Sequence, residues 1–228
     1  MDSTSFKTRN PCLSIKLWVA LVLLFVQKQA WAQVPYSSGT KARVSIEHFT
    51  PANGLAADKV ISVAQDTTGY IWIGTQEGLH RYDGYALRLY QHDPEDSRSL
   101  SDNTVEKIYV DRAGTLWVGT WNGLNRYDPR TDSFHHYHHD PEDTTSLSGL
   151  MVIDMQEDAQ GRLWVAMGMG LGGLSRYAPE TDAFARYLPR AKDPYSLASN
   201  NPSRLYLDKS GNLWIGMGSP FDRELNYG

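Results

Sequence analysis

The stretch Asp111-Arg-Ala-Gly-Thr-Leu-Trp-Val-Gly-Thr120 decides the fold, because the chain contains it four times in related forms. Each copy has a glycine three residues after the aspartate and a tryptophan six residues after it. The other copies begin at Asp66, Asp158 and Asp208. Successive tryptophans are 45, 47 and 50 residues apart, and they are Trp72, Trp117, Trp164 and Trp214. Self-similarity at such a period is the signature of a repeat architecture.

Two more motifs follow the first in the same order. A Gly-Leu-x-Arg-Tyr segment occupies residues 78–82, 123–127 and 173–177, and a segment ending in tyrosine follows at residues 87–90, 134–137 and 184–187. The fourth copy loses the pattern after Met217, and the third has Val165-Ala166-Met167 where the others have a central glycine. The sequence therefore predicts three complete units and part of a fourth within residues 44–228.

Each unit is predicted to be a sheet of four short antiparallel strands. An apolar run such as residues 60–66 forms the first strand, and Asp-x-x-Gly then suits a hairpin turn. In the second strand Tyr70 and Trp72 face one side, while Ile71 and Ile73 face the other. A sheet that is apolar on both faces is buried when several sheets stack radially. We therefore predict an all-β propeller with the repeated tryptophans between adjacent sheets; a flat β-sandwich is the alternative.

The first 32 residues have the layout of a secretory signal peptide. Basic residues precede the apolar run 17–26, which is too short for a comfortable membrane span. Small residues flank Trp31 and indicate cleavage after Ala32; an uncleaved anchor helix is the alternative. Residues 33–43 are then a short linker to the repeats, and residues 44–49 are expected to form the outer strand of the last blade of a closed ring.

Composition narrows the classes of function. The 228 residues carry 22 Lys and Arg against 26 Asp and Glu, and residues 33–228 alone have a formal charge of −7. Duplex DNA and anionic membranes require a basic surface, so neither is an expected partner. Cleavage removes Cys12, the one cysteine of the sequence, which leaves no internal disulfide and is compatible with a bacterial periplasm.

The sequence shows no catalytic constellation. It contains no G-x-S-x-G, P-loop or dinucleotide motif, so no enzymatic activity and no cofactor are expected on this chain. The recurring aspartates stand at equivalent turns of different units and are interpreted as turn formers. The recurring arginines are expected to pair with or pack on a neighbouring unit, and they are Arg81, Arg126 and Arg176.

Two groups of residues are candidates for ligand binding. His136 and His138 share one face of a predicted outer strand and could hold a metal, although a solvated polar strand is the alternative and no metal is expected. Trp121 and Asn122 lie in a turn on the face that carries the long linkers between units. An exposed tryptophan suits stacking on a sugar or another planar group, and packing against a linker is the alternative. A small molecule or a glycan is therefore the expected ligand.

The Gly-x-Leu/Ile-Trp-Ile/Val-Gly-Thr and Gly-Leu-x-Arg-Tyr-Asp blocks resemble the two-component regulator propeller repeat. The linkers at residues 92–101 and 139–148, which share His-Asp-Pro-Glu-Asp and Ser-Leu-Ser, are also similar to that family. The resemblance covers about residues 44–217. It implies a periplasmic ligand-sensing propeller of a bacterial membrane receptor with a histidine kinase or diguanylate cyclase output.

The resemblance also implies the partners of the chain. They are the remaining blades and output domains of the receptor, together with a second receptor copy in a homodimer. The chain is then an N-terminal piece of a receptor anchored in the inner membrane. A secreted binding or scaffold propeller is the second hypothesis. A propeller enzyme such as a lyase is the third, and it needs acidic, histidine or metal ligands converging in the central funnel, none of which the sequence assigns.

Overall fold

The computed structural model describes residues 46, 48–50, 52, 54–168 and 172–218. All of these except Ile46 belong to the unit His48–Gly228. The predicted leader and linker, residues 1–43, lie outside the described residues and remain predictions. In the described part of the chain, no helix has the length and apolar character needed to cross a membrane.

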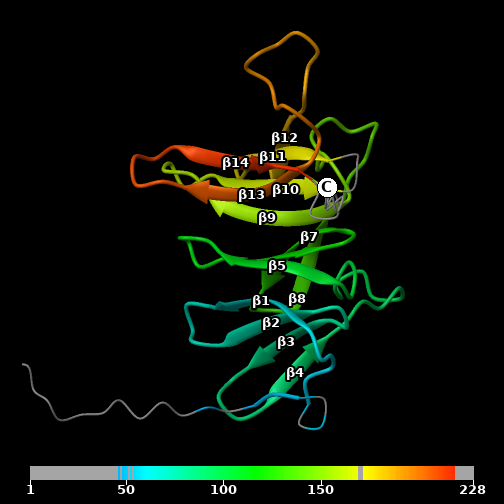
Figure 1. Cartoon of the computed structure of the whole chain (residues 1–228). Coiled ribbons are helices and arrows are strands. Elements are labelled where there is room, and N and C mark those ends of the chain that lie inside the picture. Colours follow the sequence, from blue (N-terminus) through cyan, green and yellow to red (C-terminus); the bar gives the residue numbers. More distant parts are fainter. Residues whose placement is uncertain (1–45, 47, 51, 53, 169–171, 219–228) are drawn as a thin grey trace, which may run out of the picture. The chain divides into compact units, whose positions relative to one another are not determined.

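Fourteen strands in the described residues form four antiparallel sheets (Figure 1). The first three sheets have four strands each, and hydrogen-bonded neighbours follow chain order. The first blade contains β1 (Val60–Gln65), β2 (Ile71–Thr75), β3 (Leu79–Tyr82) and β4 (Leu87–Tyr90). The second contains β5 (Val105–Val110), β6 (Leu116–Thr120), β7 (Gly123–Asp128) and β8 (Ser133–Tyr137). The third contains β9 (Met151–Glu157), β10 (Leu163–Gly168), β11 (Gly173–Ala178) and β12 (Ala183–Tyr187).

The fourth sheet has two described strands, β13 (Pro202–Leu207) and β14 (Leu213–Met217). The prediction of an all-β propeller with three complete blades and part of a fourth is thus confirmed. The first strands of successive blades, β1, β5, β9 and β13, contact one another in chain order. These four strands therefore form the inner side of the stack, and the later strands of each blade lie progressively further out.

A hydrogen bond from the turn aspartate to the tryptophan of the second strand recurs in every blade. Asp66 Oδ1 accepts the backbone N–H groups of Thr68 and Tyr70, while Oδ2 accepts Nε1–H of Trp72 at 2.7 Å. The turn ends at Gly69, whose φ of 96° favours glycine. The same bond occurs at 2.9, 2.8 and 2.7 Å in the pairs Asp111–Trp117, Asp158–Trp164 and Asp208–Trp214. The aspartates are turn formers, as predicted, and they also fix the indole rings.

The linker before each complete blade is tied to that blade by a buried polar side chain of the third strand. Asn125 Oδ1 accepts the backbone N–H of Ser101 at 2.9 Å. Equivalent bonds of 2.9 Å join His80 Nε2 to the Ala56 N–H and Ser175 Oγ to the Ser148 N–H. The three side chains on the strands are 0% exposed. Because a buried backbone N–H needs a partner, the polar residue inside Gly-Leu-x-Arg-Tyr holds the linker in place.

Neighbouring blades are joined by a cluster that contains an arginine, two tyrosines and an aspartate, which we call the interblade clasp; between the first two blades a second arginine, Arg88, also pairs with the aspartate. Between the first two blades, Asp132 Oδ1 accepts the hydroxyl groups of Tyr90 and Tyr127, both at 2.7 Å. Arg81 donates to the Tyr127 hydroxyl at 3.0 Å. Between the second and third blades the clasp consists of Arg126, Tyr137, Tyr177 and Asp182. The predicted pairing with a neighbouring blade is confirmed for the first two recurring arginines.

Burial of the repeated tryptophans depends on the blade that follows. Trp72 and Trp117 are 0% and 2% exposed, and their rings meet a tyrosine of the next blade at centroid distances of 4.9 and 5.0 Å. Trp164, which faces the two strands of the fourth sheet, is partly buried. Trp214 is 62% exposed. The predicted position between sheets is therefore confirmed where a complete blade follows.

The predicted closing strand at residues 44–49 is described only at Ile46, His48 and Phe49, and none of these is in a strand. The strand that would pair with them belongs to the last blade of the ring, which is not among the described sheets, so the closing strand stays a prediction. The ring of Phe49 packs edge-on against Tyr82 of β3, with centroids 4.8 Å apart. Tyr82 corresponds to Tyr127 and Tyr177, whose rings lie near a tyrosine on the outer strand of the preceding blade. Phe49 therefore occupies the position of that outer-strand tyrosine.

Candidate functional site

The turn between β6 and β7 holds Trp121 and Asn122 beside the start of the inner strand β5. The backbone N–H of Trp121 donates to the Thr104 carbonyl at 3.2 Å, and its indole Nε1–H reaches Glu106 Oε2 at 3.5 Å. Asn122 Nδ2 lies 3.5 Å from the Ser101 carbonyl. Trp121 remains 44% exposed. The turn therefore presents an aromatic ring, an amide and a carboxylate together at the linker face, a combination that suits a polar ligand with a flat apolar side.

Glu106 is a member of this site that sequence reasoning missed. It lies at an irregularity of the β5–β6 register, between Val105 and Lys107, where one residue is inserted into the ladder. Such a bulge redirects side chains at the edge of a sheet. The first strands of the first and fourth blades have the same register shift between their first and third residues, and in the third blade the shift lies between Val152 and Asp154 of β9. No motif in the sequence marks the bulge, because its residues differ from blade to blade.

An ion pair joins the inner strands of the second and third blades. Lys107 Nζ is 2.7 Å from Asp154 Oδ1, and the Asp154 side chain is 6% exposed. Asp154 Oδ2 also accepts the backbone N–H of Leu205 at 2.9 Å, so this carboxylate links the third blade to the fourth. In the first blade Ser62 Oγ accepts the Ile108 N–H in the same way. These polar side chains join successive inner strands. Their sequence signal is a polar residue four positions before the turn aspartate of the blade.

The candidate metal ligands His136 and His138 instead make hydrogen bonds to a linker and to the turn that holds Asn122. His136 Nε2 is 2.6 Å from the Ser99 carbonyl, and its ring centroid lies 5.5 Å from that of His138. Burial, together with the nearby His136, lowers the pKa of His138, although a hydrogen bond to the Asn122 backbone acts in the opposite direction. The described residues contain no group of three or more His, Cys, Asp or Glu side chains placed to hold a metal ion.

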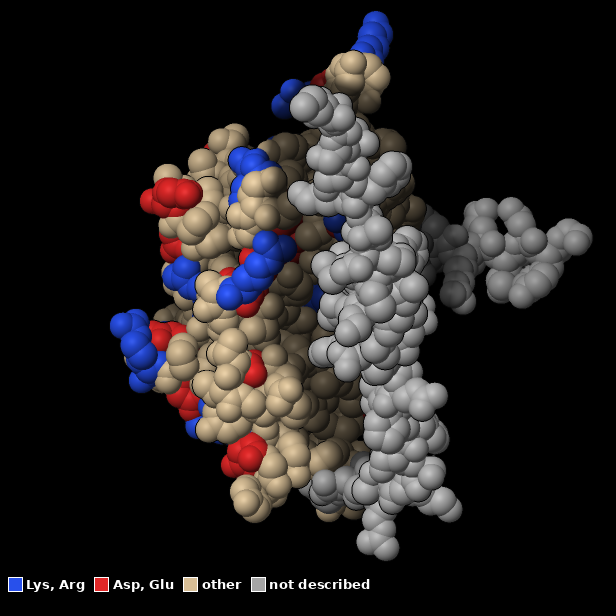
Figure 2. Space-filling model, turned by 90° about the vertical axis from the view of Figure 1, so that its left-hand side faces the viewer, with Lys and Arg blue, Asp and Glu red and all other residues tan. Residues whose placement is uncertain are grey.

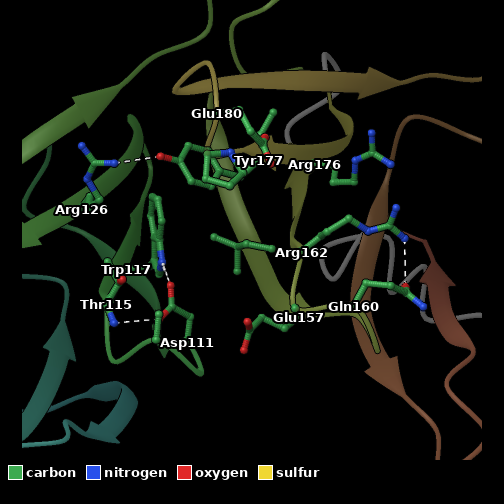
Figure 3. A pocket seen from close by; sticks show the side chains of 15 residues that line it. Asp111, Thr115, Trp117, Arg126, Glu157, Gln160, Arg162, Arg176, Tyr177 and Glu180 are labelled. Carbon is green, nitrogen blue, oxygen red and sulfur yellow. Dashed lines mark hydrogen bonds between the residues drawn. The ribbon is translucent and has the colours of Figure 1, made fainter.

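A groove between the second and third blades is a second candidate site, on the side of the Asp-x-x-Gly turns (Figure 3). Its volume is about 680 Å³. Trp117 and Tyr177 form part of its wall, and Arg126, Arg162 and Arg176 extend along it. Arg126 is bonded to Tyr177 at 2.8 Å and Arg162 to Asp158 at 2.6 Å, so two of the three guanidinium groups already have partners. The groove is therefore mainly the space between two joined blades.

Charge is distributed without a dominant sign on the face that Figure 2 shows. Lys and Arg side chains of the described residues are interspersed there with Asp and Glu.

The aspartates of the interblade clasps have lowered pKa values. Burial raises the pKa of Asp132 but hydrogen bonds from Tyr127 and Tyr90 lower it, and the net pKa lies below the ordinary aspartate value. Asp182 has the same balance of causes and the same direction. Both clasp carboxylates are therefore ionised at neutral pH and serve structure.

Four segments of the chain match the model of the two component regulator propeller family, at residues 54–77, 99–122, 146–168 and 196–219. Each segment spans the end of a linker and the first two strands of a blade. The chain is also 45% identical over 53 residues to histidine kinase P4 of Formosa agariphila, covering 23% of this chain and 4% of that protein.

Solved structures agree with this assignment. The chain is similar to an extracellular domain of a hybrid two component system, BT3049 from B. thetaiotaomicron, with a TM-score of 0.66 and 28% identity over 75% of this chain and 24% of that domain. A second extracellular domain from the same organism, of the one component system BT4673, has a TM-score of 0.59 at 22% identity over 75% of this chain and 22% of that chain, a likeness of fold. The chain thus spans about a quarter or less of each of these three proteins. Its four blades are built from the repeats of the two component regulator propeller family.

Proposed function

We propose that this chain is part of the periplasmic ligand-sensing propeller of a bacterial membrane signalling receptor. The observation that carries the proposal is its 28% identity, across three complete blades and part of a fourth, to the extracellular domain of a hybrid two component system. The kinase or cyclase output lies in a part of the receptor outside this chain. The propeller itself binds and does not catalyse.

The ligand of this sensor is a small molecule or a glycan that binds at the linker face. Trp121 supports this position because its ring is 44% exposed while a hydrogen bond to Glu106 orients it. Asn122 and Glu106 add an amide and a carboxylate for the hydroxyl groups of a sugar. A tryptophan held in this way offers an apolar plane with a polar edge, the surface that pyranose rings stack on.

A signalling assay tests the sensor role. The complete receptor is expressed with a reporter for its output, and cells are treated with neutral cello-oligosaccharides or acidic oligogalacturonides. We expect one class to change reporter activity, and deletion of residues 44–218 to abolish the response. An exported protein whose reading frame continues into no membrane-spanning or output segment would contradict the proposal and favour a secreted binding module.

A binding assay tests the position of the ligand. Trp121→Ala in the receptor propeller is expected to weaken binding of the active oligosaccharide at least about tenfold, equivalent to ~1.4 kcal/mol. Tyr85→Ala is the matched control, because Tyr85 is a 97% exposed aromatic residue in the β3–β4 turn, at the opposite end of its blade from the linkers. If Trp121→Ala binds normally and Arg162→Ala does not, the groove of Figure 3 is the binding site instead.

A further inference from the structure

Trp121 and Glu106 occupy positions at which every other blade has a different residue. Residues that the blade fold requires recur in each unit, as the turn aspartates and the tryptophans of the second strands do. The position four residues after the repeated tryptophan holds Trp121 in the second blade, and Gln76, Gly168 or Gly218 in the others. The bulge position of Glu106 holds an apolar residue or a serine in the others, namely Ile61, Ile153 and Ser203. The blade fold itself therefore explains neither side chain.

The turn that carries Trp121 rests on a buried hydrogen-bond network. Ser101 Oγ is 2.9 Å from Thr120 Oγ1 and accepts Nδ2–H of Asn125, also at 2.9 Å. These three residues are buried. The turn itself is fixed by the backbone N–H of Trp121, which donates to the Thr104 carbonyl. The exposed indole is therefore held in position before a ligand binds, which lowers the entropic cost of binding.

The Glu106 carboxylate beside this indole is open to a ligand. Within the described residues its hydrogen bond is the 3.5 Å contact from the indole N–H of Trp121, and no basic side chain of that part of the chain forms an ion pair with it. Lys107, its neighbour on β5, pairs with Asp154 instead, with Nζ 2.7 Å from Oδ1. Because a carboxylate has about four acceptor sites, Glu106 can still accept several hydroxyl groups.

The chain around this carboxylate is acidic. Asp102 Oδ1 accepts the backbone N–H of Thr104, the residue whose carbonyl holds Trp121. The linker that leads into the second blade, residues 92–104, has four acidic residues and one basic residue, which are Asp93, Glu95, Asp96, Asp102 and Arg98. Arg98 is itself paired with Asp96, with Nε 3.7 Å from Oδ1. Like charges within a Debye length, about 8 Å at physiological ionic strength, repel an anionic ligand at this face.

We propose that Glu106 is the specificity-determining residue of the Trp121 site, and that it restricts the ligand to oligosaccharides without carboxylate or sulfate groups. The Glu106 carboxylate accepts hydroxyl groups of the sugar that stacks on the indole, and it repels an acidic group in the same place. Asn122, in the same turn, presents its amide to that sugar. This inference rests on the proposed function, because it names the class of ligand for the same site.

Tetrasaccharides that share one β-1,4-linked gluco backbone test this selection by charge: cellotetraose, its glucosamine analogue and its glucuronic acid analogue. The full chain is immobilised, so that self-association does not interfere, and each sugar is passed over it at low salt. We expect the acidic sugar to bind about tenfold more weakly than cellotetraose, and the amino sugar about tenfold more tightly, because an ammonium group pairs with a carboxylate. Glu106→Gln should remove most of both differences and change cellotetraose binding by less than about threefold.

Glu77→Gln is the matched control, because Glu77 is an exposed carboxylate in the β2–β3 turn, the equivalent turn of the first blade. This variant should keep both differences, and a loss equal to that in Glu106→Gln would overturn the proposal in favour of a diffuse field. Equal binding of cellotetraose and the acidic sugar would also overturn it; if Trp121→Ala abolishes that binding, the proposed position of the ligand still stands. Absence of binding by all three sugars overturns the inference, and the receptor assay decides the proposed function separately. Far-UV circular dichroism of each variant confirms that the blades are folded.

Discussion

At the scale of single residues, the repeated aspartate and tryptophan form one unit. The carboxylate satisfies the N–H groups of its own turn with one oxygen and an indole N–H with the other. A buried tryptophan needs a partner for that N–H, and a turn aspartate six residues earlier supplies it at every blade. The spacing of the motif is therefore set by hydrogen-bonding geometry as well as by the hairpin.

Removal of one turn aspartate should show this coupling. Asp111→Ala leaves Trp117 Nε1–H and the Thr115 backbone N–H without their acceptor, bonds now 2.9 and 2.7 Å long. We expect a loss of about 1–3 kcal/mol in the free energy of unfolding, measured by urea titration. In a Trp117→Phe background the loss should be smaller, because one of the two donors is absent. An equal loss in both backgrounds would show that the indole bond contributes nothing.

His80 is expected to make stability depend on pH. Burial lowers the pKa of His80 below the ordinary 6.5, against a backbone hydrogen bond with Ile73 that raises it. Nε2 accepts the Ala56 N–H, and an acceptor nitrogen must be unprotonated. The folded-state pKa is thus below that of the unfolded chain, so the unfolded chain binds a proton first as the pH falls below about 6.5. The free energy of unfolding should therefore decrease from pH 7 to pH 5.

The measurement is urea unfolding of the normal chain and of His80→Asn at pH 7, 6 and 5. Asn125 occupies the equivalent position in the second blade with its amide oxygen accepting the linker N–H, so asparagine is the matched replacement. The variant should lose part of the pH dependence, and the remainder belongs in part to His138, whose pKa is also lowered. An unchanged slope in His80→Asn would contradict this role.

At the scale of strands and sheets, close approach of blades depends on the glycine two residues after each tryptophan. A Cβ atom at Gly119 would lie 2.3 Å from Val152 Cγ1, and one at Gly74 would lie 2.5 Å from Val105 Cγ1. The third blade has Ala166 at this position, fully buried with Leu174 and Leu205. The departure from glycine in the third repeat is therefore accommodated where the third blade meets the fourth.

Two alanine substitutions test this packing. Gly119→Ala should destabilise the chain by about 1–3 kcal/mol, because Val152 must move to admit the methyl group. Gly216→Ala is the matched control: it is the same position in the fourth sheet, and its nearest neighbour would be 3.5 Å away. Its effect should be close to zero in chemical denaturation. Equal effects at the two positions would mean that strand propensity, and not blade contact, selects glycine.

At the scale of the whole repeat array, the apolar residues of a blade are buried only where a neighbouring sheet packs against that blade. Apolar residues are exposed at both ends of the described array: Val63 is 59% exposed on β1, and Tyr206 and Trp214 are 63% and 62% exposed on the fourth sheet. Exposed sheet faces of this kind promote association. We expect the isolated chain to self-associate in light scattering, whereas a receptor propeller with all its blades should be monodisperse in the same buffer.

The cost of replacing a repeated tryptophan, in free energy of unfolding, should also depend on whether a blade follows it. Trp117→Ala is expected to cost about 3–5 kcal/mol, because the 2% exposed ring is enclosed by the third blade. Trp214→Ala should cost much less in this chain, where that ring is 62% exposed. In a propeller with further blades the two costs should converge. Urea unfolding of both variants gives the comparison, and equal costs in the chain alone would contradict the dependence on a following blade.

The sequence by itself determined the blades, because the turn, the alternation and the period are short-range properties. Asp-x-x-Gly selects the hairpin, and alternation along residues 70–73 sets which side of the strand is apolar. The position of Trp121 in an exposed turn followed from the same pattern. The sequence also indicated that the recurring arginines meet a neighbouring blade, since they recur once per unit without a local partner.

Only the tertiary structure decided which residues meet across blades. Arg81 and Asp132 are 51 residues apart, as are Asp154 and Leu205, and their contacts depend on the register between separately formed sheets. Glu106 reaches Trp121 because a bulge redirects it, and a bulge leaves no composition signal. Local turn chemistry acts within a few residues and can be predicted from the sequence, whereas the stacking of sheets is a property of the assembled array.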